Sequence, residues 1–470
     1  MTETAVPAGG NLVSLGAIQL FRLLSSFAIN VMVMRGLGVE GFGVYGYVTT
    51  LVGLAAFGSS MGMDRLLKRE IARDQGSAGR YVATAMAAST LLSLATGVVI
   101  LAWAWGMDGR PLVIGSAVLA ALSLALSSLA VVPVSYFHAI RRMQLGVSAN
   151  AVGRFALVVA TLVFLVLQFD VLAVFGAQVI DSALTLGLLW YTFRKVSAQK
   201  LATTGADIRD LLRVSVPFGL NALFVSVYLS VDVILVQLAW GDAEVGIYRG
   251  AVMLLTLLTV VAETLSTGIF PRMATHLGKP EAAGAELAFT SRVMLALSLP
   301  AAVGGVMTAG PLMVLVGGEG FAASAAPFIR MAPLLPFRFL SNGAGMALSA
   351  LDRQADRTRG ALIAAVLNVV VNLYVIPRYG AMGAAGTTLL TEIVLWAWMQ
   401  WRVSSLVTGL GLGVVLLRVG VPTAAMAATL WALPDLPVVL SIVVGAGVYG
   451  VGALLTGAVE PGDIARLRGV

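Results

Sequence analysis

Apolar runs of about twenty residues recur along the entire chain, and no other feature limits the fold as strongly. A run of that length is what a helix needs to cross the hydrocarbon core of a bilayer. Fourteen such runs cover most of the 470 residues and leave no room for a separate aqueous domain. We therefore predict an all-α polytopic membrane protein of about 14 transmembrane helices, at residues 11–34, 43–63, 81–104, 111–139, 147–168, 171–192, 214–239, 247–270, 291–309, 323–350, 360–377, 381–401, 412–433 and 437–457.

Composition excludes several classes of function. The chain is 59% apolar and only 11% charged, whereas soluble domains are about 25% charged, so a soluble enzyme is excluded. It has no cysteine, and its two histidines, His138 and His276, are too few for a histidine metal site. No G-x4-GK[ST] phosphate loop occurs. We expect no catalytic residues, no metal and no cofactor.

The positions of the cations predict the orientation in the membrane. Of the 30 Lys and Arg residues, 21 lie in the tail or in loops that follow even-numbered runs. Loops that follow odd-numbered runs hold four, namely Arg35, Arg110, Arg249 and Arg378. Because Lys and Arg are retained on the cytoplasmic side during insertion, both termini are predicted to be cytoplasmic. The net charge of +7 is then a topology signal, and we expect no nucleic-acid partner.

Two pairs of short segments indicate an internal repeat. LGVEGFGVY at 37–45 and WGDAEVGIY at 240–248 share the frame G-x4-G-x-Y, and AIRR at 139–142 recurs as ALDR at 350–353. Each pair falls after corresponding helices of two six-helix halves, so the halves are predicted to form a parallel pseudo-repeat. We assign residues 1–205 to an N-lobe of helices 1–6 and residues 206–403 to a C-lobe of helices 7–12. Residues 404–470 form helices 13 and 14 with a cytoplasmic tail.

Arginines inside the apolar runs predict where an anion binds. Arg22 and Arg338 lie near the centres of their runs, and Asn342 follows Arg338 by one helical turn. Arg154 and Arg330 lie closer to helix ends, and Arg330 is predicted to point within about a quarter turn of Arg338. A charge at mid-bilayer costs at least ~2.5 kcal/mol, so it tends to face water or a partner. We expect these five side chains to line a cationic cavity between the halves; for Arg154 and Arg330 the alternative is snorkelling to the headgroups.

Acidic side chains are embedded as well, at Asp181, Asp232, Glu263 and Glu392. Each is a candidate ion-coupling residue that binds a proton or Na⁺, and the alternative is an internal ion pair with one of the arginines. Arginine binds phosphate oxygens in pairs and stays charged at any relevant pH, so the buried arginines favour an anionic cargo. Tyr45 and Tyr248 mark helix ends and are expected at the membrane interface.

Several segments together resemble a known family. These are RGLGVEGFGVY (35–45), DRLLKREIAR (64–73), YLSVDVILVQ (228–237), GDAEVGIYRGA (241–251), IFPRMA (269–274) and LNVVVNLYVIPRYGAMGAAGTTLLTE (367–392). Their sequences and their order resemble the Wzx-type polysaccharide flippases of the multidrug/oligosaccharidyl-lipid/polysaccharide exporter superfamily. The resemblance covers helices 1 to 12.

The resemblance implies a pair of six-helix lobes, V-shaped, that alternate between inward-open and outward-open states. The cargo it implies is an undecaprenyl-pyrophosphate-linked oligosaccharide repeat unit, moved from the cytoplasmic to the periplasmic leaflet of the bacterial inner membrane. The product would serve O-antigen, capsule or exopolysaccharide assembly, and the partners would be membrane lipids, a polysaccharide polymerase and a chain-length regulator. Drug exporters of the superfamily commonly carry an acid in the first helix, where this chain has Arg22.

Other functions remain as alternatives. A lipid II-type flippase differs only in the headgroup carried, and a cation-coupled exporter belongs to the same superfamily. An integral-membrane glycan polymerase or ligase normally needs a sizeable periplasmic loop, and every loop after an odd-numbered run is short here. A membrane scaffold would not explain arginines deep within the apolar runs.

Overall fold

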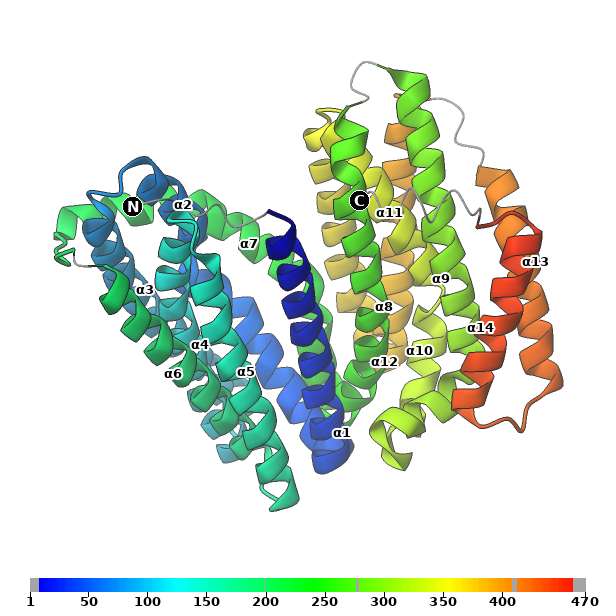
Figure 1. Cartoon of the computed structure of the whole chain (residues 1–470). Helices are drawn as coiled ribbons and strands as arrows, with labels where there is room; N and C mark the ends of the chain where they lie inside the picture. Colours follow the sequence, from blue (N-terminus) through cyan, green and yellow to red (C-terminus); the bar gives the residue numbers. More distant parts are fainter. Residues whose placement is uncertain (1–7, 198, 276–278, 408–411, 460–470) are drawn as a thin grey trace. The chain divides into compact units, whose positions relative to one another are not determined.

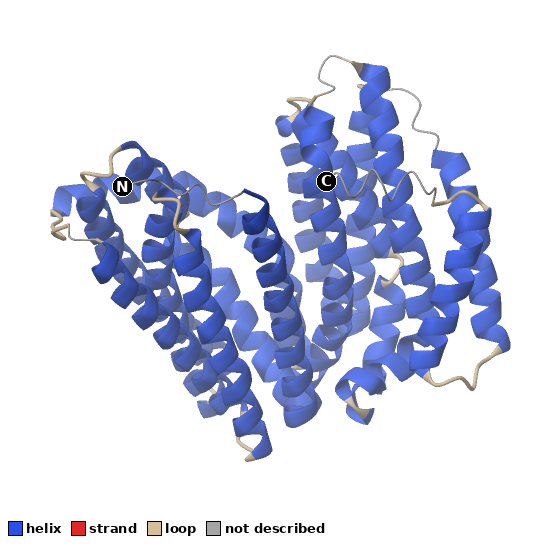
Figure 2. Ribbon diagram, viewed as in Figure 1, coloured by secondary structure: helices blue, strands red, loops and turns tan. Residues whose placement is uncertain are grey.

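The structure, a computed structural model, describes residues 8–197, 199–275, 279–407 and 412–459. Within these ranges the chain is helical with short connections and contains no strand (Figure 2). Nine helices of the described residues are long and apolar enough to cross a membrane. The predicted all-α polytopic fold is confirmed.

The described residues form fourteen α-helices that follow one another along the chain (Figure 1). They are α1 (Ala8–Ser60), α2 (Met63–Arg73), α3 (Ala78–Trp103), α4 (Pro111–Ala139), α5 (Met143–Val166), α6 (Val171–Val196), α7 (Gly205–Trp240), α8 (Asp242–Ala274), α9 (Pro280–Gly317), α10 (Ala325–Met331), α11 (Leu334–Ala350), α12 (Gln354–Ser404), α13 (Leu412–Ala432) and α14 (Val438–Leu455). A π-helical turn, Ala104–Asp108, follows α3, and a 3-10 helix, Glu319–Ser324, precedes α10.

These helices accommodate the fourteen predicted spans without matching them one to one. Helix α1 contains the first two predicted runs and bends at Gly38, while α12 contains the eleventh and twelfth and bends at Gly380. Both glycines have positive φ, which an L side chain rarely adopts. Helix α2 is additional: its apolar residues recur every fourth position, and they are buried while its charged face is open.

The prediction of one continuous helix over 323–350 is wrong. The structure has two helices there, α10 and α11, separated at Ala332 and Pro333. Pro333 and Pro336 have no backbone N–H to donate, so the hydrogen-bond ladder is interrupted. The predicted direction of Arg330 relative to Arg338 assumed an unbroken helix and therefore no longer follows.

The chain divides into two compact units, residues 1–238 and 239–470. In the first unit, side chains of α2 to α6 form one apolar core that includes Leu67, Tyr136, Phe137 and Phe193. The second unit has one core around Met273, Leu348 and Met399 and another that joins α9, α11, α13 and α14. The predicted division into lobes at 205 and 403 stays a prediction.

Both units bend at corresponding places. Residues with positive φ occur in pairs about 210 residues apart: Gly38 and Gly241, Gly109 and Gly318, Arg141 and Asp352, Gln168 and Gly380. The first and third pairs lie in the segments that indicated the repeat from sequence. Four pairs of this kind give the two units the same order of helices and turns, which supports the predicted repeat.

Two tyrosines make corresponding contacts in the two units. The hydroxyl of Tyr45 accepts a hydrogen bond from Gln178 Nε2 at 3.4 Å, and the hydroxyl of Tyr248 lies 3.5 Å from Thr388 Oγ1. Both tyrosines are buried, so their predicted place at the membrane interface is wrong. They lie close to helix ends in sequence, but the last helix of each half packs over them.

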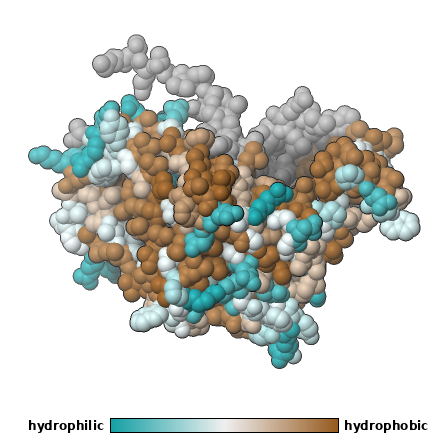
Figure 3. Space-filling view, turned by 90° about the horizontal axis from the view of Figure 1, so that it is seen from below, coloured by the Kyte–Doolittle hydropathy of each residue, from teal (hydrophilic) through white to brown (hydrophobic). Residues whose placement is uncertain are grey.

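Large apolar side chains cover much of the surface. Many are at least half exposed, among them Leu94, Val98, Phe155, Leu362 and Val370. Figure 3 shows such side chains over much of the visible face, with hydrophilic residues gathered in smaller groups. In water this surface would drive aggregation, whereas lipid tails cover it without cost.

Candidate functional site

The most heavily buried charge pair among the predicted site residues joins α11 to the second part of α12. Arg338 donates from Nη2 to Glu392 Oε1 at 2.6 Å and from Nε to the same oxygen at 3.0 Å. The Glu392 side chain is 4% exposed and the Arg338 side chain 27%. A carboxylate so buried requires a cation, because an uncompensated buried charge is strongly destabilising. The structure thus pairs a predicted anion-binding residue with a predicted ion-coupling residue, while the arginine keeps partial access to its surroundings.

Buried amides and hydroxyls continue from this pair within α12. Because the helix turns back at Gly380, its two parts lie side by side, and Asn368 Nδ2 donates to Thr391 Oγ1 at 3.5 Å. Asn372 Nδ2 donates to Asn368 Oδ1 at 3.1 Å, and Asn372 Oδ1 is buried without a partner. The sequence interpretation missed these residues; their signal was two asparagines four positions apart in an apolar run.

The bend of α12 is held by an acid from α8. Glu244 Oε1 accepts a hydrogen bond from the backbone N–H of Ala381 at 2.8 Å. A Cβ at Gly380 would lie 2.5 Å from that oxygen, so the glycine both adopts positive φ and makes room for the carboxylate. This contact fixes the register between Asn368 and Thr391.

Asp181 of α6 lies in a different environment. It is half-buried and accepts a hydrogen bond from Thr185 Oγ1 at 3.4 Å. No Lys or Arg nitrogen of the described residues lies within 4 Å of it, although Arg154 is near enough to interact electrostatically. The carboxylate packs against Gly153 of α5, where a Cβ would come 2.5 Å from Oδ1.

The remaining predicted site residues are spread over several helices. Arg330 is exposed on α10, with its Nε 3.0 Å from where a Cβ of Gly386 would lie. Asn342 is half-buried on α11, and Asp232 Oδ1 of α7 accepts a hydrogen bond from the N–H of Val233 at 2.8 Å. The side chains of Arg22 and Glu263 lie outside the described residues. The structure therefore groups Arg338 with Glu392, and Arg154 with Asp181, and it places Arg330 against Gly386 of α12.

The second unit also contains an apolar groove of about 470 Å³. It lies among α9, α11, α12 and α13, all within the second unit, and its lining includes Leu299, Val303, Phe337, Leu340, Trp396 and Leu416. Phe337 and Leu340 of α11 line the groove, whereas Arg338 of the same helix faces Glu392. A partly exposed guanidinium can bind an anionic head, and a wholly apolar groove can accept a hydrocarbon chain.

In the part of the chain that is described, no group of three or more His, Cys, Asp or Glu side chains is placed to hold a metal ion.

Comparisons with known proteins find similarity to two families and to one curated relative. A family described as "Polysaccharide biosynthesis protein" matches residues 9–276, and one described as MatE matches residues 217–374. A probable low-salt glycan biosynthesis flippase of Haloferax volcanii is 21% identical over 364 residues, which cover 77% of this chain and 76% of that protein.

Solved structures share the fold. The lipid II flippase MurJ in an inward closed conformation aligns with a TM-score of 0.79 at 12% identity and covers 94% of this chain and 98% of that chain. A multidrug resistance MATE family transporter of the MOP superfamily in an inward-facing conformation aligns with a TM-score of 0.64 at 16% identity. That alignment covers 82% of this chain and 94% of the transporter.

Proposed function

The chain belongs to the polysaccharide biosynthesis protein family, and from this premise we propose that it is a flippase for lipid-linked glycans. The superfamily resemblance inferred from the sequence is confirmed by the family, the relative and the shared fold. The proposed cargo is an undecaprenyl-pyrophosphate-linked oligosaccharide repeat unit, moved from the cytoplasmic to the periplasmic leaflet by alternating access. The product feeds O-antigen, capsule or exopolysaccharide assembly.

The observation that carries this proposal is the buried Arg338–Glu392 pair, which lies in the same unit as an apolar groove. A diphosphate does not enter hydrocarbon unaided, because removing its charges from water costs many kcal/mol. Arg338 offers a fixed cation at membrane depth, and the groove accepts part of the polyprenyl chain. Arg22, Arg154, Arg330 and Asn342 are proposed as further cargo-binding residues.

Competition at Arg338 connects cargo binding with ion coupling. When a phosphate oxygen takes the place of Glu392 at the guanidinium, the freed carboxylate is buried and favours a proton or Na⁺. Asp181, Asp232 and Glu263 are the other acids proposed for this role. Under this mechanism the proton or Na⁺ gradient drives ion binding at the acids, and the cargo binds to the arginines.

We also propose the membrane in which the protein lies and a transport role for it. The protein is a multi-pass membrane protein, and we place it in the bacterial inner membrane with both termini cytoplasmic. Its relatives are flippases and transporters, which supports a transport role rather than catalysis. A polymerase and a chain-length regulator are the partners that the exported unit requires.

A lipid II-type flippase is the second candidate, and the fold shared with MurJ favours it. The two candidates differ in the sugars attached to the same kind of lipid diphosphate. The binding residues named above do not distinguish them, because they address the diphosphate and the lipid chain.

Reconstitution in liposomes tests the proposal and separates the candidates. Fluorescent undecaprenyl-pyrophosphate-oligosaccharide and fluorescent lipid II are each loaded, and the protected fraction is measured with a membrane-impermeant quencher. We expect the oligosaccharide lipid to flip at least about tenfold faster with wild type than with Arg338→Ala, which is ~1.4 kcal/mol in the barrier. Arg378→Ala, which removes an exposed arginine of α12, is the matched control and keeps the wild-type rate. Release of free sugar or lipid would identify an enzyme instead.

A further inference from the structure

The connection between α6 and α7 lies against the start of α3 instead of running free. The Gln199 amide makes two hydrogen bonds there: Oε1 accepts from the N–H of Gly79, and Nε2 donates to the carbonyl of Gln75. A Cβ at Gly79 would lie 2.5 Å from the carbonyl oxygen of Lys200. The backbones therefore approach so closely that only glycine fits at this position.

Further along the connection, the contacts with α3 are made between side chains. Thr203 Oγ1 lies 2.8 Å from Thr84 Oγ1, one turn into α3. Asp207, in the first turn of α7, pairs with both edges of the Arg80 guanidinium: Nε donates to Oδ2 at 3.0 Å, and Nη2 donates to Oδ1. Contacts thus recur at 199, 203 and 207, each on the first turns of α3.

Asp207 is also fixed by its own helix. The N–H of Thr204 donates to Asp207 Oδ2 at 3.1 Å, and the N–H of Asp207 donates to Thr204 Oγ1 at 3.2 Å. This reciprocal arrangement is a capping box, which satisfies two N–H groups at the start of α7. Asp207 precedes the apolar part of α7, and hydrogen bonds from Arg80, with help from the cap, lower its pKa to about 2.

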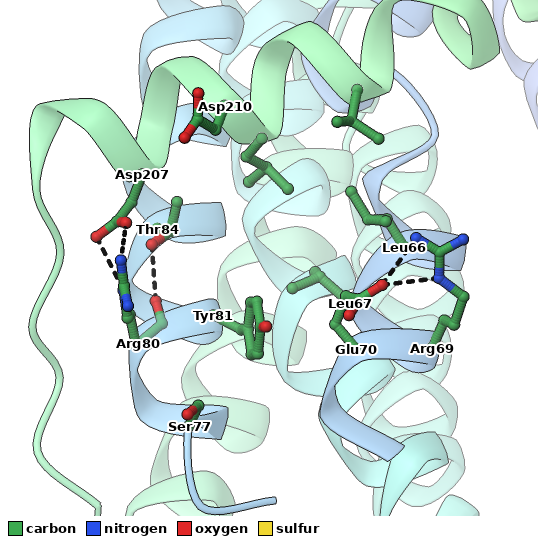
Figure 4. Close-up of a pocket in the computed structure, with 12 residues that line it drawn as sticks. Leu66, Leu67, Arg69, Glu70, Ser77, Arg80, Tyr81, Thr84, Asp207 and Asp210 are labelled. Carbon is green, nitrogen blue, oxygen red and sulfur yellow. Dashed lines mark hydrogen bonds and ion pairs between the residues drawn. The ribbon is translucent and has the colours of Figure 1, made fainter. Parts of the chain in front are cut away.

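The first turns of α7 cover a pocket of about 330 Å³ formed with α2 and α3 (Figure 4). Leu211 and Val214 of α7 line it together with Leu67 and Tyr81. The Asp207 side chain is 13% exposed here although Arg80 is 64% exposed. The beginning of α7 is therefore built into the first unit, by apolar cover as well as by polar contacts.

We propose that residues 199–207 form a strap that fixes the start of α7 to α3 and stays closed while the protein transports. Loss of the strap would release the polar connection and would leave the backbone N–H of Gly79 and the carbonyl of Gln75 without the Gln199 side chain. At its other end, α7 is held within the second unit, where Trp240 Nε1 donates to the carbonyl of Ile376 at 2.9 Å. The strap sets the position of one end of the helix that joins the two units. The transport part of this inference rests on the proposed function, and the strap itself does not.

Disulfide trapping tests the strap, and the chain has no natural cysteine to interfere. Thr84→Cys with Thr203→Cys is expected to crosslink nearly completely in membrane vesicles under mild oxidation. Thr90→Cys with Thr203→Cys is the control, because Thr90 is exposed on the same helix and six residues away. The oxidised Thr84→Cys/Thr203→Cys protein is expected to flip lipid-linked oligosaccharide at the wild-type rate. A crosslink that stops flipping until reductant is added would overturn the inference, and so would equal crosslinking of the two pairs.

Variants that weaken the strap should slow the formation of the same crosslink, each by a different factor. Gly79→Ala places a Cβ against the Lys200 carbonyl and should slow crosslinking at least about tenfold. Gly97→Ala on the same helix meets only an ordinary van der Waals contact, 3.9 Å from Ala121 Cβ, and should not change the crosslinking rate. Asp207→Asn keeps the cap but loses the charge, and Arg80 is mostly exposed, so about a two- to fivefold slowing is expected. If Gly79→Ala crosslinks as fast as wild type, the close approach is wrong. If wild type does not flip any lipid-linked glycan, the crosslinking result still stands.

Discussion

The two units place an acid at nearly the same point of corresponding helices, Asp181 on α6 and Glu392 on the second part of α12, but surround it differently. Asp181 and Glu392 follow by three and four residues the side chains that meet the buried tyrosines, Gln178 and Thr388. Glu392 is neutralised by Arg338, whereas among the described residues Asp181 has a hydrogen bond from the Thr185 hydroxyl and a longer-range interaction with Arg154. The corresponding stretch of α4 supplies Ser127 and Ser128 in place of an arginine. The two units therefore share backbone geometry, but they differ in the charged side chains at corresponding positions.

Ser127 and Ser128 are themselves engaged with neighbouring helices. Ser127 Oγ lies 2.9 Å from Ser182 Oγ, and Ser128 donates to Ser59 at 2.7 Å. The first unit thus uses neutral hydroxyl contacts where the second uses an ion pair. This difference predicts unequal responses to the same substitution in the two units.

The largest effect is expected from removing the acid of the second unit. Glu392→Ala leaves Arg338 without its carboxylate partner, and breaking such a pair costs about 3 kcal/mol, the low end for buried pairs because Arg338 is partly exposed. Asp181→Ala should cost less than about 1 kcal/mol. Thermal unfolding of the purified protein in detergent measures both. Arg338→Met combined with Glu392→Leu should recover most of the loss, and equal destabilisation by the two single alanines would contradict the comparison.

The second prediction concerns the helix that packs against each acid, where the two units should differ in the cost of an alanine to stability. A Cβ at Gly153 would lie 2.5 Å from Asp181 Oδ1 and 3.0 Å from the Asp181 carbonyl oxygen, while the second unit has Ala364 and Ala365 in the corresponding stretch. Gly153→Ala should destabilise by about 1–3 kcal/mol, since α5 and α6 must move apart. Gly187→Ala on α6 meets nothing within 4 Å and is the control. Unchanged stability in Gly153→Ala would mean that the first unit has room for the alanine that the second already contains.

The two tyrosine contacts are equivalent, so removing either hydroxyl should cause the same loss of stability, smaller than the losses above. Tyr45→Phe and Tyr248→Phe each remove one long hydrogen-bond contact, so each should cost about 0.5–1.5 kcal/mol. Tyr379→Phe, at an exposed position, should cost nothing measurable. Denaturant titration of the three variants measures the difference. A clear inequality between Tyr45→Phe and Tyr248→Phe would limit the repeat to backbone geometry.

Sequence reasoning predicted the spans and the repeat well because both depend on local signals. An apolar run of fixed length defines a span, and Gly38 and Gly241 mark bends because glycine adopts positive φ without strain. Arg141, Asp352 and Gln168 adopt the same conformation, but their residue types give no such signal. The break before α11 was missed even though Pro333 was visible in the sequence.

The candidate site was only partly predictable because it depends on distances between helices. Arg338 and Glu392 were each identified as buried charges, with a cavity role and an ion pair as alternatives. Sequence alone does not show that α11 and α12 bring them within 2.6 Å. Tyr45 and Tyr248 were misplaced for the same reason, since whether a residue near a helix end is covered depends on the neighbouring helices.

The smallest expected effect concerns the exposed ion pair of the first unit, as opposed to the buried pair of the second. The charged groups that line the same pocket as Asp207 are Arg80 on α3, Arg69 and Glu70 on α2, and Asp210 on α7. Because the folded pKa of Asp207 is about 2, below its ordinary value of 3.8, its contribution to the strap is complete above pH 3.8 and is lost as the pH falls toward 2. Crosslinking of the Thr84→Cys/Thr203→Cys pair, normalised to cysteine reactivity, should therefore stay constant from about pH 8 to pH 5 and decline only in stronger acid. Asp207→Asn should abolish the acid decline, and a decline in the wild-type strap already between pH 8 and pH 5 would show that another group controls it.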